Sequence, residues 1–515
     1  MPLEPLPESL PSAVRALADA LAPSGFTADG IAEHLGPHAT AALYRGEPGV
    51  VLAACDASPL SRLIRFFLVR EPASQAQLDE LLTPDLVRML LDATVIRPAA
   101  NDRFAVALDL RPHVLAGQDR LIVSDLDASM TAHVPGPDHV LGVGSASLSL
   151  LSASPETPVD TVLDLGCGSG VQAVAQAGVA QRVVATDVHP RALELARATL
   201  AANRIDNVEL RQGPWFEPVA DERFDRIVAN PPFVVGLPEV GHVYRDSGLS
   251  LDGATELVVG QAPAHLAEGA TACILGAWVH RTGESWRSRV ASWLPSRGVS
   301  AWVLERDVVD PGQYVSTWLA DESVDVRSPE AVERTERWLA HFRDNDVEAI
   351  GFGWIFLREI GDNPTEITAE DLSHPFTDPL GPEVDEYFTR AEWLRGRGTD
   401  DILDAAYMVR PGVALERVSV ADAEAGMGFA QRVTRVSRTD GPRFTHEVDD
   451  GVVSILSGLH PQGLPLREVV GLLVASQGVD DPAEHTRLEN NAAAIVVDCV
   501  RHGLVLPAEI IAKES

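Results

Sequence analysis

Lysine is almost absent from this chain: Lys513 is the only lysine among 515 residues, so arginine supplies nearly all of the positive charge. Cysteine is also scarce, and no Cys-x-x-Cys pair occurs, which argues against a disulfide framework or a zinc site. The four cysteines are Cys55, Cys167, Cys273 and Cys499. No apolar run reaches the roughly 18–20 residues that span a bilayer. The first ten residues carry acids where a signal peptide carries bases. We therefore expect a cytoplasmic protein with no membrane partner.

Positive charge is too sparse for non-specific binding to nucleic acid. The formal net charge is −34, distributed as −10 over residues 1–160, −3 over 161–300 and −21 over 301–515. Neutralising phosphates needs clustered lysine and arginine, which the chain as a whole does not offer. A local arginine patch is still compatible with these numbers, so a specific nucleic-acid substrate stays open.

The chain is too long for one typical domain, and its pattern divides it into three parts. The first part, residues 1–130, contains three short helices followed by two strands over 59–108, with a hairpin signal at Asn101-Asp102. Three helices and a hairpin predict a winged-helix-like domain. The alternative is a small helical cap that only packs on the next domain.

The second part, residues 131–360, alternates apolar strands with helical stretches. Seven strand candidates occur, among them TVLDLG from Thr161 and FDRIVAN from Phe224. This alternation predicts an α/β fold, a doubly wound Rossmann-like sheet of seven strands with helices on both faces. The last two strands lack a clear helical crossover and predict an antiparallel edge.

The third part, residues 361–515, is strongly acidic and begins with the proline-rich segment GDNPTEITAEDLSHPFTDPLGPEVDEYF. That composition is typical of a linker or an extended surface segment. The stretches VALERVSV, QRVTRVSR and RFTHEV alternate like strands, and two helices and a short strand follow them. We expect an α+β domain, with a second winged-helix-like unit at its end as one interpretation.

A glycine-rich turn is the first candidate binding site. The stretch VLDLGCGSGVQA, Val162 to Ala173, places Gly166, Gly168 and Gly170 between a predicted strand and a predicted helix. Glycines let a backbone turn tightly and approach a ligand, and a helix N-terminus adds amide donors. Asp187 ends the next strand, 19 residues after Gly168, where a carboxylate can accept both hydroxyls of a ribose. A helix N-cap is the alternative role for Asp187.

In these motifs the chain resembles the class I S-adenosylmethionine-dependent methyltransferases, over roughly residues 135–360. The resemblance implies S-adenosyl-L-methionine as the cofactor. It also implies a role for each motif residue. The methionine end would be held by Asp164, Gly166, Cys167, Gly168 and Gly170, the ribose by Asp187, and the adenine would be flanked by Val188.

The resemblance has one departure and one weaker extension. After the third strand the family often carries an acid that contacts the adenine amino group, whereas this chain reads RQGPWFEPV. Because Pro214 cannot make that contact, we expect backbone atoms near Gly213 or the Trp215 ring to take its place. The stretch PDHVLGVGSASLSLL, residues 137–151, sits where the family closes over the methionine end.

A second chemical motif, Asn230-Pro231-Pro232-Phe233, directly follows a predicted strand. Two prolines end a strand and make a stiff turn. A planar NH2 group is a poor nucleophile, and it needs acceptors that hold both hydrogens so that its lone pair points at the methyl carbon. We expect the Asn230 oxygen and the Pro231 carbonyl to be these acceptors, Pro232 to stiffen the turn, and Phe233 to stack on the planar group. A purely structural turn is the alternative.

This motif brings the resemblance near the amino-group and amide methyltransferases. The stretches NPPFVVGLPEVG and SGLSLDGATELVVGQAPAHL resemble the release-factor glutamine methyltransferases, and NPPF is also common among RNA base methyltransferases. We slightly favour N-methylation of an exocyclic amine of an RNA base, with RNA or a ribosomal particle as partner. A protein glutamine, a small-molecule substrate and a non-catalytic cofactor-binding protein stay open.

Two further sets of polar residues are given no functional role. His34 and His38 have a metal-like spacing, but Gly36-Pro37 between them breaks the helix that would align them, so no metal site is expected. Asp252 lies near the expected active face, but the chemistry does not require it. We interpret it as a solvated surface acid.

Overall fold

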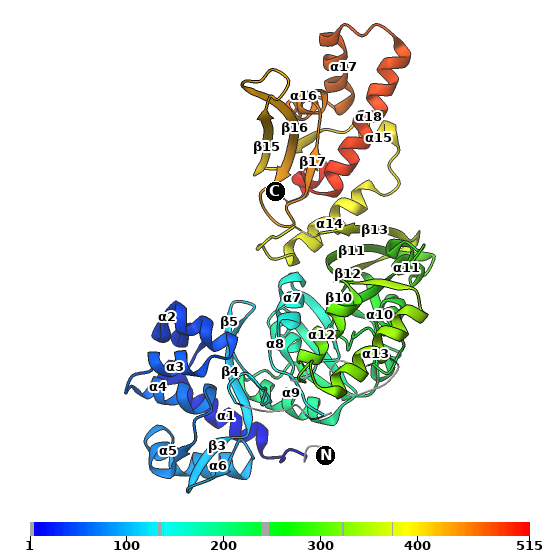
Figure 1. Cartoon of the computed structure of the whole chain (residues 1–515). Helices are drawn as coiled ribbons and strands as arrows, with labels where there is room; N and C mark the ends of the chain where they lie inside the picture. Colours follow the sequence, from blue (N-terminus) through cyan, green and yellow to red (C-terminus); the bar gives the residue numbers. More distant parts are fainter. Residues whose placement is uncertain are drawn as a thin grey trace. The chain divides into compact units, whose positions relative to one another are not determined.

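The chain forms two compact units, Met1–Ser373 and His374–Ser515 (Figure 1). The computed structural model describes residues 5–131, 136, 138–237, 247–321, 324–372 and 374–514. The predicted boundary at residue 360 falls inside strand β12 (Val347–Pro364), and strand β13 (Glu366–Asp371) follows it in the same sheet. The predicted linker directly after Gly361 is therefore wrong, because the chain continues through the sheet before the second unit begins.

The N-terminal part is mainly helical and carries one small sheet. Strands β2 (Ile96–Ala99) and β3 (Arg103–Val106) form the predicted hairpin, and β1 (Ala73–Ser74) pairs with β3. Asn101 and Asp102 at the turn have φ of 60° and 52°, a region that these two residue types tolerate well. The helices are α1 (Leu10–Leu21), α2 (Ala28–Arg45), α3 (Pro48–Ala54), α4 (Pro59–Leu63), α5 (Gln75–Leu81), α6 (Pro84–Asp92), a 3-10 turn (Ala22–Ser24) and a π turn (Ile64–Leu68). The predicted hairpin is confirmed, and the winged-helix-like classification of this part stays a prediction.

This N-terminal part shares a core with the sheet that follows it. Helix α1 packs on α9 (Pro190–Ala202), and Ala192, Leu195, Ala198 and Ala202 of α9 are buried in the N-terminal hydrophobic cluster. The long hairpin of β4 (Leu108–Leu115) and β5 (Gln118–Asp125) also joins α9, since the Val123 amide donates to Thr199 Oγ1 at 3.1 Å. The first 130 residues and the sheet therefore fold as one unit, and their separation into two functional domains stays a prediction.

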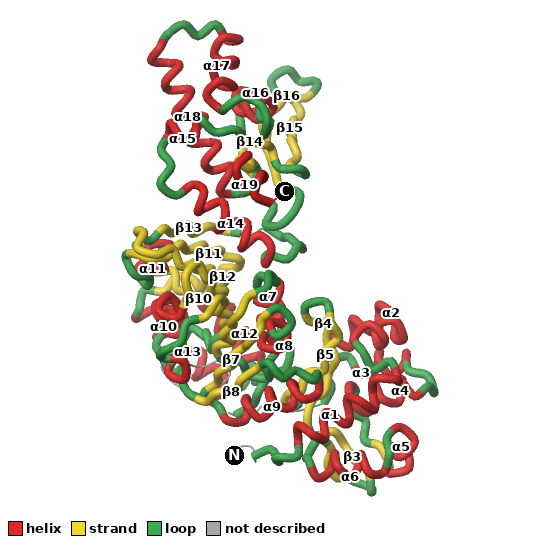
Figure 2. The backbone as a smooth tube through the Cα atoms, turned by 180° about the vertical axis from the view of Figure 1, so that it is seen from behind, coloured by secondary structure: helices red, strands yellow, loops and turns green. Residues whose placement is uncertain are grey.

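A mixed sheet of eight strands, in the order β13-β11-β12-β10-β9-β6-β7-β8, forms the centre of the first unit (Figures 1 and 2). Strands β10, β9, β6, β7 and β8 are parallel, whereas β12 runs antiparallel between β10 and β11. The strands are β6 (Val159–Leu165), β7 (Ala180–Asp187), β8 (Val208–Gln212), β9 (Phe224–Ala229), β10 (Leu266–Arg281), β11 (Arg297–Val309), β12 and β13. All seven predicted strands are present, but the count of seven is wrong because β13 adds a parallel edge strand beside β11.

Helices cover both faces of this sheet, as a doubly wound fold requires. On one face α10 (Gly253–Gln261) and α11 (Trp286–Ser292) pack on Trp278, and on the other α12 (Pro311–Asp321) and α13 (Pro329–Asp344) pack on Ala277 and Val279. The remaining helical segments are α7 (Ser145–Ala153), α8 (Val171–Gln176) and the 3-10 turns Glu217–Val219 and Ala262–His265.

Asp252 belongs to the interior of this fold. It is 2 % exposed, accepts the Val279 amide at 3.0 Å, and receives two bonds of 2.7 Å from the Arg289 guanidinium. The interpretation of Asp252 as a solvated surface acid is therefore wrong, because its carboxylate joins α10, α11 and β10.

The second unit is an α+β domain, as predicted. Its strands form a three-stranded sheet, β15-β16-β17, and a separate pair, β14-β18. The helices are α14 (Gly381–Leu394), α15 (Thr399–Leu403), α16 (Asp450–Gly458), α17 (Leu466–Gln477), α18 (Pro482–Arg501) and α19 (Ala508–Glu514); the strands are β14 (Tyr407–Val409), β15 (Val413–Ala421), β16 (Phe429–Arg438), β17 (Thr445–Glu447) and β18 (Val505–Pro507). After α18 the chain pairs β18 with β14. Up to residue 514 no hairpin follows α18, so the end of this unit lacks the hairpin expected of a second winged-helix-like unit.

Six charged side chains form a closed ring inside the second unit. In order, the ring contains Glu383, Arg390, Glu386, Arg410, Asp440, Arg438 and again Glu383. Glu383, Arg390 and Arg438 are at most 3 % exposed, and each acid contacts two arginines. Since the charges alternate and cancel, the ring joins α14, the segment after β14 and the end of β16 without leaving an uncompensated buried charge.

Over the described residues, the helices are all too short or too polar to cross a membrane.

Candidate functional site

The glycine turn after β6 is held by backbone hydrogen bonds to the neighbouring strand. The amides of Gly166 and Cys167 both donate to the Thr186 carbonyl at 2.9 Å. Gly166 and Gly168 have φ of 75° and 53°, and a Cβ at either would meet no atom within 4 Å. Glycine at these two positions therefore leaves open space over the turn, as the sequence predicted for a ligand site.

Gly170 has a different role in the same turn. Its φ is 87°, and a Cβ there would lie 3.4 Å from the Ala196 Cβ. The glycine lets α8 approach α9 closely, so this position serves packing. It does not line the cavity described below.

Asp164 lies beneath the turn and bonds to protein. It is 1 % exposed, and its Oδ2 accepts the Ala173 amide in the first turn of α8 at 2.9 Å. Burial raises the pKa of Asp164 to about 7; the Ala173 bond opposes this shift and the nearby Asp187 charge adds to it. The carboxyl thus caps α8 and does not line the cavity, so any contact with a cofactor stays a prediction.

Asp187 at the end of β7 ties the turn to the strand. Its Oδ2 accepts the Gly168 amide and its Oδ1 accepts the His189 amide, both at 2.9 Å. Burial raises the pKa of Asp187, and these backbone bonds oppose the shift. The bond to the His189 amide is of the kind that a helix N-cap makes, and Asp187 also lines the cavity. The N-cap role and the ribose role are therefore compatible in this geometry.

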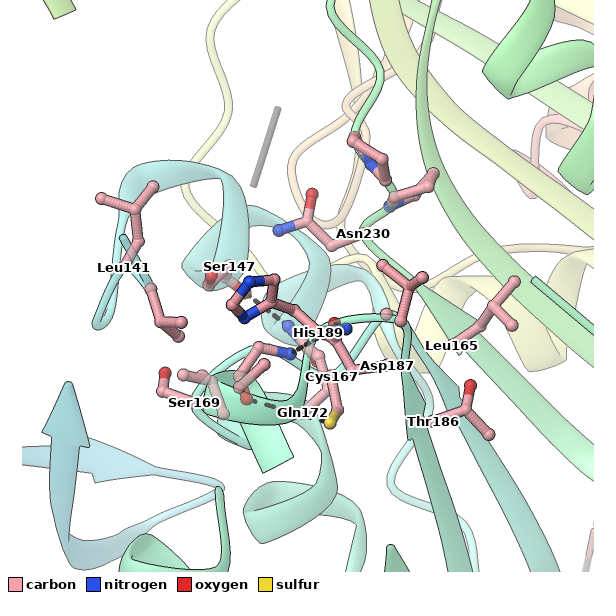
Figure 3. A pocket seen from close by; sticks show the side chains of 18 of the residues that line it. Leu141, Ser147, Leu165, Cys167, Ser169, Gln172, Thr186, Asp187, His189 and Asn230 are labelled. Atoms are coloured by element: carbon pink, nitrogen blue, oxygen red, sulfur yellow. Dashed lines mark hydrogen bonds between the residues drawn. The ribbon is translucent and has the colours of Figure 1, made fainter. Parts of the chain in front are cut away.

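A cavity of about 480 Å³ lies above the turn at the carboxyl ends of the parallel strands (Figure 3). Ten of the thirteen predicted site residues line it: Gly166, Cys167, Gly168, Asp187, Val188, Gly213, Trp215, Asn230, Pro231 and Pro232. Carboxyl ends of parallel strands are where open α/β sheets bind ligands. The structure therefore brings the two sequence motifs together around one cavity, and Asp164, Gly170 and Phe233 lie outside its lining.

The Asn230-Pro231-Pro232 turn presents its amide to this cavity (Figure 3). Among the residues that the structure describes, none forms a hydrogen bond with the Asn230 side chain. The chain after it is held firmly, since the Val235 amide donates to the Tyr314 hydroxyl at 2.6 Å and Trp338 Nε1 donates to the Val235 carbonyl at 3.2 Å. The turn is thus rigid while its amide is open to a substrate.

Phe233 lies outside the cavity lining. Its side chain packs against the buried cluster that contains Val234, Val235 and Trp338, away from the cavity lining. Stacking on a substrate stays a prediction for this residue. The part of VVGLPEVG from residue 238 onward lies outside the described residues.

The departure after β8 still contributes to the cavity. The Gly213 amide donates to the Asp187 carbonyl at 3.0 Å, and Trp215 has a φ of 50°. Gly213, Pro214 and Trp215 all line the cavity next to Val188. The expected substitutes for the missing acid therefore line the cavity, and their contact with adenine stays a prediction.

His139 and Ser147, from the stretch 137–151 that the resemblance places at this site, line the cavity, whereas Gln172 and His189 are lining residues to which the sequence analysis gave no role. Gln172 is 4 % exposed, and its Nε2 donates to the Ser147 carbonyl in α7 at 2.9 Å. His189 Nε2 lies 3.4 Å from Asp138 Oδ1. The available signal for Gln172 was its polarity within the otherwise apolar first turn of the helix after the glycines.

The thiol and imidazole groups give no metal site in the described ranges, where no cluster of three or more His, Cys, Asp or Glu side chains occurs. Cys167 lines the cavity, but burial raises the pKa of its thiol well above the ordinary value. His34 Nε2 contacts Ser61 Oγ at 2.7 Å, and α2 is broken at Gly36, with φ of 74°.

Comparison with known proteins adds a family to this geometry. The profile of the methyltransferase small domain matches residues 141–266, which include the glycine turn, Asp187 and Asn230. The chain contains a class I S-adenosylmethionine-dependent methyltransferase domain. This methyltransferase domain is flanked by two domains of unknown function, matched over residues 23–107 and 385–507.

Curated relatives of the methyltransferase domain include two kinds of enzyme. The release factor glutamine methyltransferase of Aliivibrio fischeri is 38 % identical over 115 residues, 22 % of this chain and 38 % of that protein. The ribosomal RNA small subunit methyltransferase C of Escherichia coli is 35 % identical over 147 residues, 28 % of this chain and 39 % of that protein. The chain thus spans less than half of the length of either relative.

Among solved structures, the 16S rRNA N2 G1207 methyltransferase of T. thermophilus, in complex with AdoMet and guanosine, is similar over 46 % of this chain and 64 % of that chain. Its sequence identity is 19 % and its TM-score 0.27.

Proposed function

We propose that the protein is an S-adenosylmethionine-dependent N-methyltransferase that methylates a planar nitrogen, with an exocyclic amine of an RNA base as the favoured substrate. The observation that supports this most is that Asn230, Pro231 and Pro232 line the same cavity as the glycine turn and Asp187. A methyl donor held by the turn and a nitrogen held by Asn230 would therefore meet in one cavity.

The residues of the cavity fit S-adenosyl-L-methionine. Gly166 and Gly168 leave open space where any other residue would place a Cβ, and Asp187 offers a carboxylate at the strand tip. We assign the methionine end to the turn, including Cys167, and the ribose to Asp187. The adenine is assigned to Val188, Gly213 and Trp215. When bound, the cofactor supplies an electrophilic methyl group.

The chain's own contribution is to hold the nitrogen. The Asn230 side-chain oxygen and the Pro231 carbonyl accept the two N–H groups, which aligns the lone pair with the reacting carbon. Prolines at positions 231 and 232 keep the acceptors from moving. An amide oxygen is too weak a base to take up the released proton, so the proton passes to solvent.

Substrate choice is supported from two sides. An RNA base is favoured because curated relatives include ribosomal RNA methyltransferases and because the N-terminal part has the element order of a winged helix. A protein glutamine is the second candidate, because other relatives are release factor glutamine methyltransferases and the net charge is −34. We assign substrate docking to residues 1–130 and propose a cytoplasmic RNA or ribosomal target.

The test offers radiolabelled S-adenosylmethionine with total RNA, ribosomal subunits or a protein extract, each taken from cells that lack the protein. Asn230→Ala should lower label transfer by about 100-fold, since one preorganised acceptor is lost, while the affinity for S-adenosylhomocysteine stays within about 2-fold because the turn is intact. Asn345→Ala, the same change at the end of α13 and outside the cavity, is the matched control.

Label in RNA that Asn230→Ala abolishes supports the favoured substrate, and label in a protein band supports the glutamine alternative. Full transfer by Asn230→Ala would refute the proposed role of the motif. No transfer to any fraction, with the cofactor bound, would favour a small-molecule substrate or a non-catalytic binding protein.

A further inference from the structure

Gln172 presents a buried hydrogen-bond acceptor that no described residue uses. The residue is 4 % exposed and lines the cavity (Figure 3). Its Nε2 donates to the Ser147 carbonyl at 2.9 Å, and its Oε1 has no hydrogen-bond partner among the residues that the structure describes. A buried polar atom without a partner costs roughly 1–3 kcal/mol, so such atoms in native proteins usually meet a ligand or water.

The orientation of the Gln172 amide follows from chemistry. A carbonyl oxygen only accepts hydrogen bonds, so the group facing the Ser147 carbonyl must be the NH2. The Oε1 is consequently the atom left for the cavity. A partner of that atom must be a donor, which excludes a carboxylate or an unprotonated ring nitrogen.

Position along the sheet selects one donor among those of the cofactor. Gln172 bonds to α7, and α7 packs on β10 and α8. Helix α8, which carries Gln172, packs on β6 and β7, and the Gln172 side chain turns to α7 on the β10 side of that helix, whereas Asp187, Val188 and Gly213 lie at the ends of β7 and β8. With ribose and adenine at β7 and β8, the donor that remains on the β6 side is the ammonium group of the methionine end.

We propose that Gln172 Oε1 accepts a hydrogen bond from the α-ammonium group of the cofactor and thereby positions its methionine end. This inference rests on the proposed function, because it assumes that S-adenosyl-L-methionine occupies the cavity. Gln172 is a positioning residue that acts at the end of the cofactor remote from the adenine. The Ser147 carbonyl in α7 holds the Gln172 amide in place. Binding of the ammonium group would therefore fix the position of α8 relative to α7.

The test measures ligand affinity by titration calorimetry, independent of turnover. The probes are S-adenosylhomocysteine, which carries the α-ammonium, and 5′-methylthioadenosine, which lacks the whole amino-acid end. Gln172→Met keeps the length of the side chain but removes the acceptor. It should weaken S-adenosylhomocysteine about 10-fold, as expected for a bond to a charged group, and change 5′-methylthioadenosine by less than about 2-fold.

A matched control lies one turn later on the same helix. Gln176 is 3 % exposed, and its Oε1 accepts from Arg226 Nη1 at 2.9 Å. Gln176→Met is expected to lower thermal stability and to leave the affinity ratio of the two probes unchanged. Gln172→Glu keeps an acceptor oxygen but loses the NH2 that donates to the Ser147 carbonyl, so it should bind S-adenosylhomocysteine more tightly than Gln172→Met does, and retained binding of 5′-methylthioadenosine shows that both variants are folded.

Equal weakening of both probes by Gln172→Met, or no weakening at all, would overturn the proposal. A wild-type protein that binds neither probe at millimolar concentration would instead overturn the cofactor assignment, and this inference with it. Normal probe binding together with absent transfer to RNA and protein would contradict the proposed substrates and leave the Gln172 result valid.

Discussion

Buried carboxyl groups have pKa shifts of opposite sign at the cavity of the first unit and in the charge ring of the second. Burial alone would raise the pKa of Glu386, but its bond to Arg410 and the charges of three arginines reverse this and lower it. Asp164 beneath the glycine turn has no cation beside it, and burial raises its pKa to about 7. The ring is built so that every charge is compensated, which serves stability. The cavity leaves polar groups uncompensated, which is what a binding site requires.

The two regions consequently respond to pH with opposite sign. Glu386 and Asp440 have lowered pKa values, so their contribution to stability is present above the ordinary pKa and is lost as pH falls through the folded one. Asp164 has a raised pKa, so its contribution is present below the ordinary value of 3.8 and is lost as pH rises toward about 7.

The largest expected effect comes from breaking the ring. Glu383→Ala would leave Arg390 and Arg438 buried without their shared acid, and removing one partner of a buried pair costs roughly 3–5 kcal/mol. The free energy of unfolding of the second unit, followed by urea denaturation, should fall by that amount.

Glu47→Ala removes an acid that pairs with Arg45 at the surface of the first unit, and it should leave the free energy of unfolding almost unchanged because solvent screens the pair. Affinity for S-adenosylhomocysteine should stay unchanged in Glu383→Ala, because every cavity residue lies in the first unit. A loss comparable to that of Glu47→Ala would mean that the ring is not a stabilising element.

A smaller effect is expected when the uncompensated carboxyl is replaced. Asp164→Asn keeps an oxygen that can accept the Ala173 amide but cannot ionise. Between pH 5 and 7 the free energy of unfolding of the variant should rise relative to wild type by about 1.4 kcal/mol per pH unit. The reason is that folded wild type keeps a proton on Asp164 that the unfolded chain has already lost, so each pH unit destabilises wild type only. Denaturation midpoints at three pH values measure this difference. Parallel pH profiles for the two proteins would contradict the raised pKa.

From the sequence, most strands of the sheet and the two motifs that meet at the cavity could be predicted. Most of the seven strands could be predicted because strands buried on both faces are continuous apolar runs. The eighth, β13, was missed because Glu366–Asp371 is a polar edge strand within a proline-rich acidic stretch, which reads as a linker. Its pairing with β11 is a tertiary contact that no local pattern encodes.

Individual roles within the site were harder to predict than their location. Asp164 and Phe233 sit in the motifs, but burial directs one toward α8 and the other toward the Trp338 cluster. Gln172 and Ser147 meet only because α7 and α8 pack together, which sequence spacing does not reveal. A motif therefore predicts which turn approaches a ligand, and packing decides which of its side chains face that ligand.

The smallest expected effects separate two glycines of one turn. At Gly168 a Cβ would point into open space, whereas at Gly170 it would lie 3.4 Å from the Ala196 Cβ, and both positions have positive φ. Alanine at either should cost about 1 kcal/mol from backbone strain, with Gly170→Ala losing somewhat more through the α8–α9 contact. Only Gly168→Ala should also weaken S-adenosylhomocysteine, by about 10-fold, because its methyl group would occupy the cavity. Calorimetry and thermal melts on both variants measure the two effects. Equal affinities would show that the space over Gly168 is not where the ligand lies, and would move the ligand toward Asn230 and away from the turn.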